Sequence, residues 1–262
     1  MNKRIVIVGA GNVATHIART LAEKGCTPVQ VWSRSEESAS ALAEQVGCEY
    51  VTCMDNILDE ADAFIISVAD RALPDVIDSL CRKNRRGVFI HTAGTMPMQL
   101  FEGHADHYGV LYPMQTFSKQ KLLDFSEVPC FIEASDNMAL DEVRQVAGML
   151  SKRVYELSSD NRRWLHVAAV FACNFTNACY TMAARILEEH GLDFSMMLPL
   201  VDETTRKLHS LRPADAQTGP AARGDHNVMN KHLEMLDNHA DLQDIYKIMS
   251  EEIEKASQIQ RN

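Results

Sequence analysis

The stretch RIVIVGAGNVATHIARTLAEKG, residues 4–25, places a glycine-rich turn directly between an apolar run and a helical pattern. Gly9 permits a tight turn, Gly11 leaves room for a pyrophosphate beside the backbone, and Ala14 lets the helix pack closely on the strand. The unpaired amides at the start of such a helix also attract an anion. At the first predicted strand, this GxGxxA pattern predicts a dinucleotide-binding fold.

Strand and helix patterns alternate from this turn to about residue 158, and beyond it only helical patterns continue. Such alternation predicts a doubly wound, mostly parallel α/β sheet of the Rossmann type, followed by an all-helical domain. The predicted domains are residues 1–158, which would bind the dinucleotide, and residues 159–262, which would serve substrate binding and dimerisation. The predicted strands are Arg4–Val8, Val29–Trp32, Ala63–Val68, Gly87–His91, Tyr108–Leu111, Cys130–Glu133 and Arg153–Leu157. The predicted helices are Val13–Lys24, Glu36–Val46, Arg71–Cys81, Met138–Leu150, residues 160–190, Ser195–Leu211, His226–Asp237 and Leu242–Gln258.

The segment VQVWSRSEES, residues 29–38, lies where NAD-binding folds usually carry an acid for the ribose hydroxyls. It offers Ser33, Arg34 and Ser35 instead, and these side chains can hydrogen-bond to, pair with and stack beside a phosphorylated ribose. The turn therefore predicts NADP(H) rather than NAD(H) as the cofactor. A solvent-facing turn with an incidental arginine is the alternative.

Two further predicted strands end in polar residues, and ligands of open α/β sheets lie outside the carboxyl ends of the strands. The runs FIISVAD and VFIHTAG end at Asp70 and Gly94. Asp70 is either a helix N-cap or a ligand contact, and His91 is either a buried structural histidine or a functional one. The predicted cofactor-binding residues are Gly9, Gly11, Asn12, Val13, Ala14, Ser33, Arg34, Ser35, Ser67, Val68, Ala69, His91, Thr92 and Ala93.

The predicted helix over residues 160–190 carries three polar side chains, His166, Asn174 and Asn177, in an otherwise apolar pattern. At about 100° per residue, these three side chains share one face of the helix. Buried amides need partners, so the pattern indicates either a catalytic pocket or a polar dimer interface with buried water. We take all three as candidate catalytic residues, and His166 as the candidate acid–base group, because histidine titrates near neutral pH.

Candidate substrate-binding residues come from two other segments. Tyr112 and Gln115 follow a predicted strand near the same sheet edge, and a structural role is the alternative for each. Arg223, in TGPAARGDHN (residues 218–227), is placed to anchor a substrate carboxylate beside a helix N-terminus. Asp225 in the same segment is a good N-cap for the following helix, which alone would explain that end of the motif.

Composition excludes several classes of function. The formal net charge of −10 argues against nucleic-acid binding, because phosphate neutralisation needs clustered Lys and Arg. The apolar stretch 166–187 is interrupted by polar side chains that are costly in lipid, so we expect no membrane contact and a helix buried in protein, at a homodimer interface. No HExxH, HxxxH or CxxC metal pattern occurs. Seven scattered cysteines and an N-terminus unlike a signal peptide predict a cytoplasmic protein.

Six motifs occur in one order: the glycine loop, the Ser-Arg-Ser turn, SVAD, HTAG, YPMQTFS (residues 112–118) and TGPAARGD (residues 218–225). With them the chain resembles the bacterial Rossmann-like proteins that have a helical C-terminal domain of unknown function. Those proteins are described as NADP-dependent oxidoreductases. They are similar to pyrroline-5-carboxylate reductase, ketopantoate reductase and the NADP oxidoreductases that serve a deazaflavin coenzyme. The resemblance implies a dimerising helical domain and an active site between the two domains.

The resemblance has one departure, since prephenate-dehydrogenase-like relatives carry His-Pro-Met where this chain has Tyr112-Pro113-Met114. The chemistry of that histidine therefore does not transfer to this chain. We expect an NADP(H)-dependent oxidoreductase that transfers hydride to or from a small, acidic keto or imino compound in the cleft between the domains. A sensor or scaffold that binds NADP(H) without turnover is the alternative.

Overall fold

The structure is a computed structural model that describes residues 3–121 and 123–261. The chain forms two compact units, Met1–Asn174 and Phe175–Asn262. The described strands all lie in the first unit, and the elements of the second are helices. The predicted fold class, an α/β sheet followed by helices, is therefore confirmed. The domain boundary predicted after residue 158 follows the last strand and stays a prediction.

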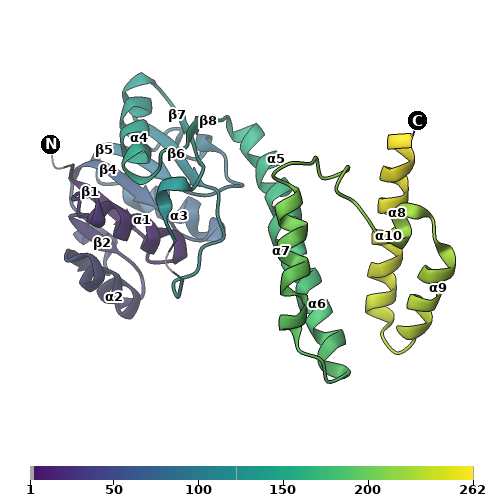
Figure 1. Ribbon diagram of the computed structural model, residues 1–262. Helices are drawn as coiled ribbons and strands as arrows, with labels where there is room; N and C mark the ends of the chain where they lie inside the picture. Colours follow the sequence, from purple (N-terminus) through teal and green to yellow (C-terminus); the bar gives the residue numbers. More distant parts are fainter. Residues whose placement is uncertain (1–2, 122, 262) are drawn as a thin grey trace. The chain divides into compact units, whose positions relative to one another are not determined.

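In the described part of the chain, eight strands form one sheet in the order β3-β2-β1-β4-β5-β6-β7-β8 (Figure 1). Every neighbouring pair is parallel except the pair β6 and β7, which is antiparallel. The strand order reverses between β1 and β4, and ligands of such sheets bind in the crevice at the carboxyl ends beside such a reversal. The strands are β1 (Ile5–Val8), β2 (Gln30–Trp32), β3 (Glu49–Val51), β4 (Glu60–Ile66), β5 (Arg86–His91), β6 (Tyr108–Pro113), β7 (Cys130–Ala134) and β8 (Val154–Glu156).

Helices cover both faces of this sheet. The α-helices of the first unit are α1 (Asn12–Glu23), α2 (Glu36–Val46), α3 (Leu73–Cys81), α4 (Asn137–Leu150) and α5 (Ser159–Ala169). Alternate residues of a strand point to opposite faces, so Ile5 and Ile7 of β1 join a core with α1, α2 and α4. Val6 and Val8 join a second core with α3. All four side chains are fully buried, and each contributes about 1.5–3 kcal/mol through burial.

Short 3₁₀ segments connect several of these elements, and one π-helical segment, which has wider turns, lies between α5 and the next helix. Residues Val170–Phe175 form a π-helical segment, η5, directly after α5. The short 3₁₀ segments are η1 (Met54–Asn56), η2 (Asp70–Ala72), η3 (Met98–Phe101), η4 (Phe125–Glu127) and η6 (Phe194–Met197). The helices of the second unit are α6 (Thr176–Glu189), α7 (Leu198–Lys207), α8 (Pro220–Arg223), α9 (His226–Met235) and α10 (Ala240–Arg261).

Two sequence predictions about these elements are wrong. The strand β3 was not predicted, because Glu49 and Tyr50 are exposed on a short edge strand and leave no apolar run. The segment between the predicted helices Ser195–Leu211 and His226–Asp237 contains a short helix that was not predicted, α8, which begins at Pro220. Proline is well suited to the first turn of a helix, where its missing N–H costs no hydrogen bond.

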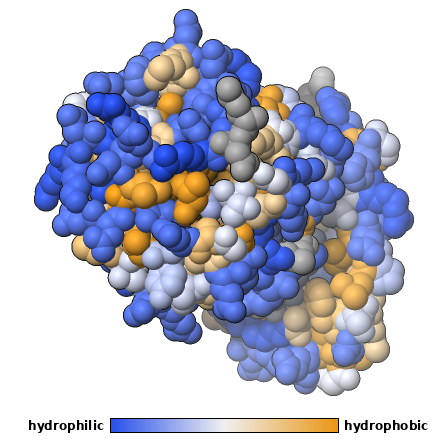
Figure 2. All heavy atoms as spheres, turned by 90° about the vertical axis from the view of Figure 1, so that its left-hand side faces the viewer, coloured by the Kyte–Doolittle hydropathy of each residue, from blue (hydrophilic) through white to orange (hydrophobic). Residues whose placement is uncertain are grey.

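The apolar helix expected to be buried at a homodimer interface is not buried within the single chain, and its burial in a dimer stays a prediction. The helical stretch Ser159–Glu189 is long and apolar enough to cross a membrane by length and composition, and none of its most apolar window is buried within the chain. Trp164 is 74% exposed, for example. On the face drawn in Figure 2, hydrophilic side chains predominate, with smaller apolar patches among them.

Candidate functional site

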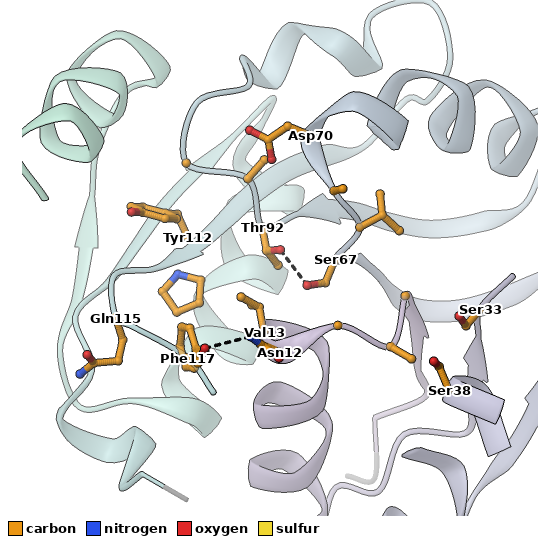
Figure 3. A pocket seen from close by; sticks show the side chains of 18 of the residues that line it. Asn12, Val13, Ser33, Ser38, Ser67, Asp70, Thr92, Tyr112, Gln115 and Phe117 are labelled. Carbon is orange, nitrogen blue, oxygen red and sulfur yellow. Dashed lines mark hydrogen bonds between the residues drawn. The ribbon is translucent and has the colours of Figure 1, made fainter. Parts of the chain in front are cut away.

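A cavity of about 560 Å³ lies in the first unit, where β1, β2, β4, β5 and β6 end (Figure 3). Three residues predicted for substrate binding or catalysis line it: Tyr112, Gln115 and His166. Ala14, which packs α1 against the sheet, and Ser35 and His91 are absent from its wall. The predicted cofactor-binding residues that line the cavity are Gly9, Gly11, Asn12, Val13, Ser33, Arg34, Ser67, Val68, Ala69, Thr92 and Ala93.

The glycine loop fits the cavity wall because a side chain has no room at Gly9. Its backbone φ is +123°, and a Cβ added there would lie 2.2 Å from the carbonyl oxygen of Ser67. The Gly9 N–H donates to the carbonyl of Trp32 at 2.7 Å, which ties the loop to β2. Gly11 is the N-cap of α1, and a Cβ added there would meet no atom within 4 Å. The loop therefore leaves the first amides of α1 open to an anion.

Of the three predicted residues in the turn after β2, Ser33 and Arg34 line the cavity and Ser35 caps α2. The Ser35 hydroxyl accepts a hydrogen bond from the Ser38 N–H at 3.2 Å and caps α2. The Ser33 hydroxyl accepts from the Ser35 N–H at 3.3 Å and still has its own proton to donate. Arg34 is exposed and makes no ion pair with any residue of the ranges 3–121 and 123–261. Ser33, Arg34 and Ser38 line the cavity, whereas the Ser35 side chain serves the helix.

The ends of β4 and β5 are joined across the cavity wall. The Thr92 hydroxyl donates to the Ser67 hydroxyl at 3.1 Å (Figure 3). Asp70 also lines the cavity, and its carboxylate accepts a hydrogen bond from the Thr95 hydroxyl. The N-cap of the following turn is Ala69, so the interpretation of Asp70 as an N-cap is wrong.

His91 has a structural environment. Its ring is fully buried, packs on the ring of Phe101 with centroids 5.8 Å apart, and its Nδ1 accepts from the Ala93 N–H at 3.2 Å. Burial, and then the positive charge of Arg162, lower the pKa of His91 from its ordinary value to about 3. The ring is therefore neutral at neutral pH, which favours the structural alternative for this residue.

Tyr112 and His166 meet at one end of the cavity, although they lie far apart in the sequence. The Tyr112 hydroxyl and His166 Nδ1 are 3.1 Å apart, and their rings meet edge to face with centroids at 6.0 Å. A Cβ on Gly94 would lie 2.7 Å from His166 Nδ1 and 2.9 Å from Tyr112 Cε2, so the pair fits only against glycine. Burial raises the pKa of Tyr112, which keeps the phenol protonated at neutral pH.

A buried ion pair holds the beginning of α5 against the sheet. The Arg162 guanidinium is fully buried and donates to Glu133 at 2.9 Å and to the carbonyl of Met96 at 2.6 Å. The Ser159 hydroxyl donates to the same Glu133 carboxylate at 2.5 Å. Residues four apart on a helix lie on one face, so this anchor places His166 beside Tyr112.

A second cavity of about 330 Å³ shares Tyr112, Gln115 and His166 with the first. Its remaining wall is mostly apolar, from Met114 and residues of α5 and the π-helical segment η5, and it includes Asn174. The wider turns of η5 interrupt the spacing of 100° per residue on which the predicted common face of His166, Asn174 and Asn177 depended, and that face stays a prediction. His166 and Asn174 nevertheless line one cavity.

Three predicted residues lie in the second unit. Asn177 is exposed on α6, and Arg223 ends the short helix α8. Their proposed roles stay predictions. The Asp225 carboxylate accepts from the Val228 N–H at 3.3 Å, so its interpretation as the N-cap of α9 is confirmed.

Sequence reasoning missed Gly94, Glu133, Ser159 and Arg162. Arg162 lies in a polar run, Ser159–Arg163, so no local pattern distinguished it from a surface arginine. Nothing in the sequence paired it with Glu133, because that contact joins two elements far apart in the chain.

Two family models and one curated protein match parts of the chain. Residues 128–253 match the family described as a domain of unknown function, DUF2520, and residues 1–77 match shikimate/quinate 5-dehydrogenase. A stretch of 71 residues is 31% identical to the glutamyl-tRNA reductase of Caldivirga maquilingensis, and it covers 26% of this chain and 18% of that enzyme.

Solved structures cover nearly the whole chain. An imine reductase from Myxococcus stipitatus in complex with NADP⁺ is 15% identical over 98% of this chain and 94% of that chain, with a TM-score of 0.73. The pyrroline carboxylate reductase of Plasmodium falciparum with NADP bound is 10% identical over 98% of each chain, with a TM-score of 0.62. These two share the fold. A protein from Bacteroides fragilis, described as a candidate NADP oxidoreductase, is 46% identical over 97% of this chain and 98% of that chain, with a TM-score of 0.92. The chain therefore belongs to the family of that protein, the Rossmann-like oxidoreductases that carry a DUF2520 domain.

Proposed function

We propose that this protein binds NADP(H) and transfers hydride to or from a small keto or imino compound. The observation that supports this most directly is a single cavity that joins the glycine loop, the Ser33–Arg34 turn and the Tyr112–His166 pair. A phosphate-binding loop alone would fit many nucleotide proteins. A protonated phenol at the other end of the same cavity favours reduction chemistry.

The residues at the glycine-loop end suit a dinucleotide with a phosphorylated ribose. The open amides at the start of α1 would hold the pyrophosphate, and Gly9 allows the loop to lie against β4. Ser33 and Ser38 have hydroxyl donors, and Arg34 has a guanidinium without an ionic partner in the described chain. These groups would hold the 2′-phosphate, which the ribose hydroxyls of NAD(H) would not replace.

The residues at the other end would move the proton. When bound, the cofactor would supply or accept the hydride at the substrate carbon. In the reductive direction, the Tyr112 hydroxyl would give its proton to the carbonyl oxygen or imine nitrogen, which yields an alcohol or an amine. His166 Nδ1, 3.1 Å from that hydroxyl, would return a proton to the phenolate. His166 thus keeps its predicted acid–base role, with Tyr112 as the group that faces the substrate.

The second cavity would hold the body of the substrate next to this pair. Its wall has no Lys, Arg, Asp or Glu among the described residues, so it suits an uncharged apolar group. A carboxylate on the substrate would need a cation from elsewhere, and Arg223 remains the proposed candidate. The proposal that the substrate is acidic therefore depends on Arg223.

We also propose a homodimer that covers the exposed apolar side of Ser159–Glu189. Trp164, Val167 and Phe171 are 74%, 46% and 65% exposed, and large apolar surfaces on a soluble chain mark interaction sites. The interior Asn and Thr side chains make lipid a poor alternative. Light scattering of the purified protein should give twice the chain mass of 29.3 kDa. A monomer that pellets with lipid vesicles would instead support a membrane contact. A cytoplasmic location stays a prediction.

Calorimetric titration with NADPH and NADH at one fixed salt concentration tests the cofactor. We expect NADPH to bind at least tenfold more tightly, and Arg34→Asp to remove most of that preference while NADH affinity changes little. Lys24→Asp, at the far end of α1, is the matched charge control. If neither cofactor bound, the proposal would fail.

A screen of keto and imino compounds with NADPH then tests turnover, with Tyr112→Phe as the variant. We expect the variant to bind NADPH normally and to lose at least a hundredfold in kcat, the range for a general acid. Tight NADPH binding without turnover of any compound would favour the sensor.

A further inference from the structure

A groove of about 220 Å³ lies between α1 and α2 and shares one wall residue with the cofactor cavity. Two cationic side chains line it: Arg19 from α1 and Lys119 from the loop that follows β6. Polar groups of α2, Ser38 and Gln45, lie on its other side. None of the site predictions from the sequence included Arg19, Lys119 or Gln45.

The loop that carries Lys119 is fastened to the start of α1. The Asn12 side-chain amide donates to the carbonyl of Phe117 at 2.9 Å (Figure 3). His16 Nε2 lies 2.9 Å from the carbonyl of Ser118, and its ring contacts that of Phe117 with centroids 5.1 Å apart. These contacts hold the chain just before Lys119 against α1, and the ring contact gives Phe117 of the YPMQTFS motif a packing role.

Neither cation of the groove has an ionic partner. No described carboxylate lies within salt-bridge distance of Arg19 or Lys119, in a chain whose net charge is −10. The carboxylates of Glu36 and Glu37 in the first turn of α2 would repel a phosphate near Arg34. Two unpaired cations in one groove raise the local concentration of anions and would offset that repulsion.

Ser38 connects the groove to the cofactor cavity, because it lines both. It is also the third residue of α2, and it lies close to Ser33 at the end of β2 (Figure 3). We propose that Arg19 and Lys119 form the second half of the 2′-phosphate site, opposite Arg34 and across Ser38. This inference rests on the proposed function, because it assigns the same cofactor a further contact. The ligand chemistry is a phosphate monoester dianion on a nucleoside.

The test compares Arg19→Gln, Lys119→Gln and Lys121→Gln in the full-length protein. Lys121 lies in the same loop with the same charge and lines none of the three cavities described here, so it is the matched control. We expect each of the first two variants to weaken NADPH binding about tenfold, the effect of losing one charge-assisted contact, and NADH binding less than twofold. Lys121→Gln should bind both as the wild type does. Lys119→Arg should retain the NADPH preference.

Two further probes separate the sources of the phosphate. Adenosine 2′,5′-bisphosphate should compete with NADPH, and its affinity should fall in Arg19→Gln and Lys119→Gln. The affinity of 5′-AMP, which lacks the 2′-phosphate, should be the same in these variants and in the wild type. If inorganic phosphate bound together with NADPH, and Lys119→Gln abolished that phosphate binding, the groove would be an independent anion site. This result would overturn the inference. An unchanged NADPH preference in both variants would also overturn it. Equal affinity of the wild type for NADPH and NADH would instead defeat the cofactor assignment in the proposed function.

Discussion

The two ends of the cofactor cavity are built in different ways. The glycine-loop end comes from short runs at strand ends, Gly9–Val13, Ser33–Arg34 and Ser67–Ala69, with Ser38 of α2, and its glycine pattern is visible in the local sequence. The other end joins Gly94, Tyr112 and His166 from three separate elements.

The difference lies in what holds each end in place. At the first end, backbone geometry and helix caps fix the groups, and exposed side chains are free to bind a ligand. At the second end, a buried ion pair between α5 and β7 holds His166, and a glycine makes space for it. Removal of a helix cap at the first end should therefore reduce the free energy of unfolding only slightly. Removal of the Arg162–Glu133 ion pair at the second end should reduce it much more.

The largest effect should come from Arg162→Leu. This change leaves the Glu133 carboxylate, which is 17% exposed, without its ionic partner in a buried environment. Breaking a buried pair from one side costs about 3–5 kcal/mol, so we expect that loss in the free energy of unfolding of the first unit. Urea unfolding monitored by tryptophan fluorescence measures it.

The neighbouring Arg163 provides the control for that experiment. It pairs with Asp160 on the surface, and Arg163→Leu should change stability by less than about 1 kcal/mol. The double variant Arg162→Leu with Glu133→Leu should recover part of the loss, because it removes the unpaired charge. Equal losses in Arg162→Leu and Arg163→Leu would show that α5 is not anchored by the buried pair.

The next effect concerns the space beside the Tyr112–His166 pair. Gly94→Ala would place a Cβ 2.7 Å from His166 Nδ1, so the imidazole must move away from the phenol. A displacement of about 1 Å in a catalytic group costs about a hundredfold, and we expect that loss in kcat with NADPH affinity within threefold. Gly148→Ala, in a helix where a Cβ meets no atom within 4 Å, should leave kcat unchanged. Unchanged kcat in Gly94→Ala would remove the pair from the mechanism.

The stability of the first unit in acid should depend on His91, the last residue of β5. Its folded pKa of about 3 lies below the unfolded value of about 6.5, so between these values the unfolded chain binds a proton that the folded chain does not. The stability contributed by neutral His91 is therefore complete above pH 6.5 and decreases as the pH falls towards 3.

The variant His91→Asn isolates this contribution, because its amide oxygen can still accept from the Ala93 N–H. Between pH 7 and pH 5 the wild type should lose about 2 kcal/mol more than the variant, at about 1.4 kcal/mol per pH unit below 6.5. Urea unfolding at the two pH values gives the difference. Identical losses would contradict the low pKa of His91.

These contrasts also explain what the sequence could predict. The glycine loop, the Ser33–Arg34 turn and the strand–helix order depend on neighbouring residues, so they can be predicted from the sequence. Residues of the loop and of the turn line one cavity. The Arg162–Glu133 pair joins residues 29 positions apart and has no local pattern. The π-helical segment η5 was not predicted, because its sequence, VFACNF, has no pattern that distinguishes a π-helical turn from an α-helical one.

The smallest effect should come from Ser35 at the glycine-loop end. The sequence placed Ser35 among the cofactor contacts, whereas its hydroxyl caps α2 and does not line the cavity. Ser35→Ala should reduce the free energy of unfolding by about 1 kcal/mol, as loss of a serine N-cap does, and should leave the ratio of NADPH to NADH affinity unchanged. Thermal unfolding and calorimetric titration of the same sample measure both.

Ser35→Asp sharpens this test, because aspartate caps helices as well as serine does but repels a phosphate. If the hydroxyl serves only the helix, the cap should survive, and any loss of NADPH affinity should come from the added charge alone. The alanine variant separates the two cases, since it adds no charge. A selective loss of NADPH affinity in Ser35→Ala would show that the hydroxyl turns from the helix to the phosphate when the cofactor binds. In that case the glycine-loop end of the cavity would rearrange when the cofactor binds. The contrast between a locally fixed end and an end held by tertiary contacts would then apply only to the protein without cofactor.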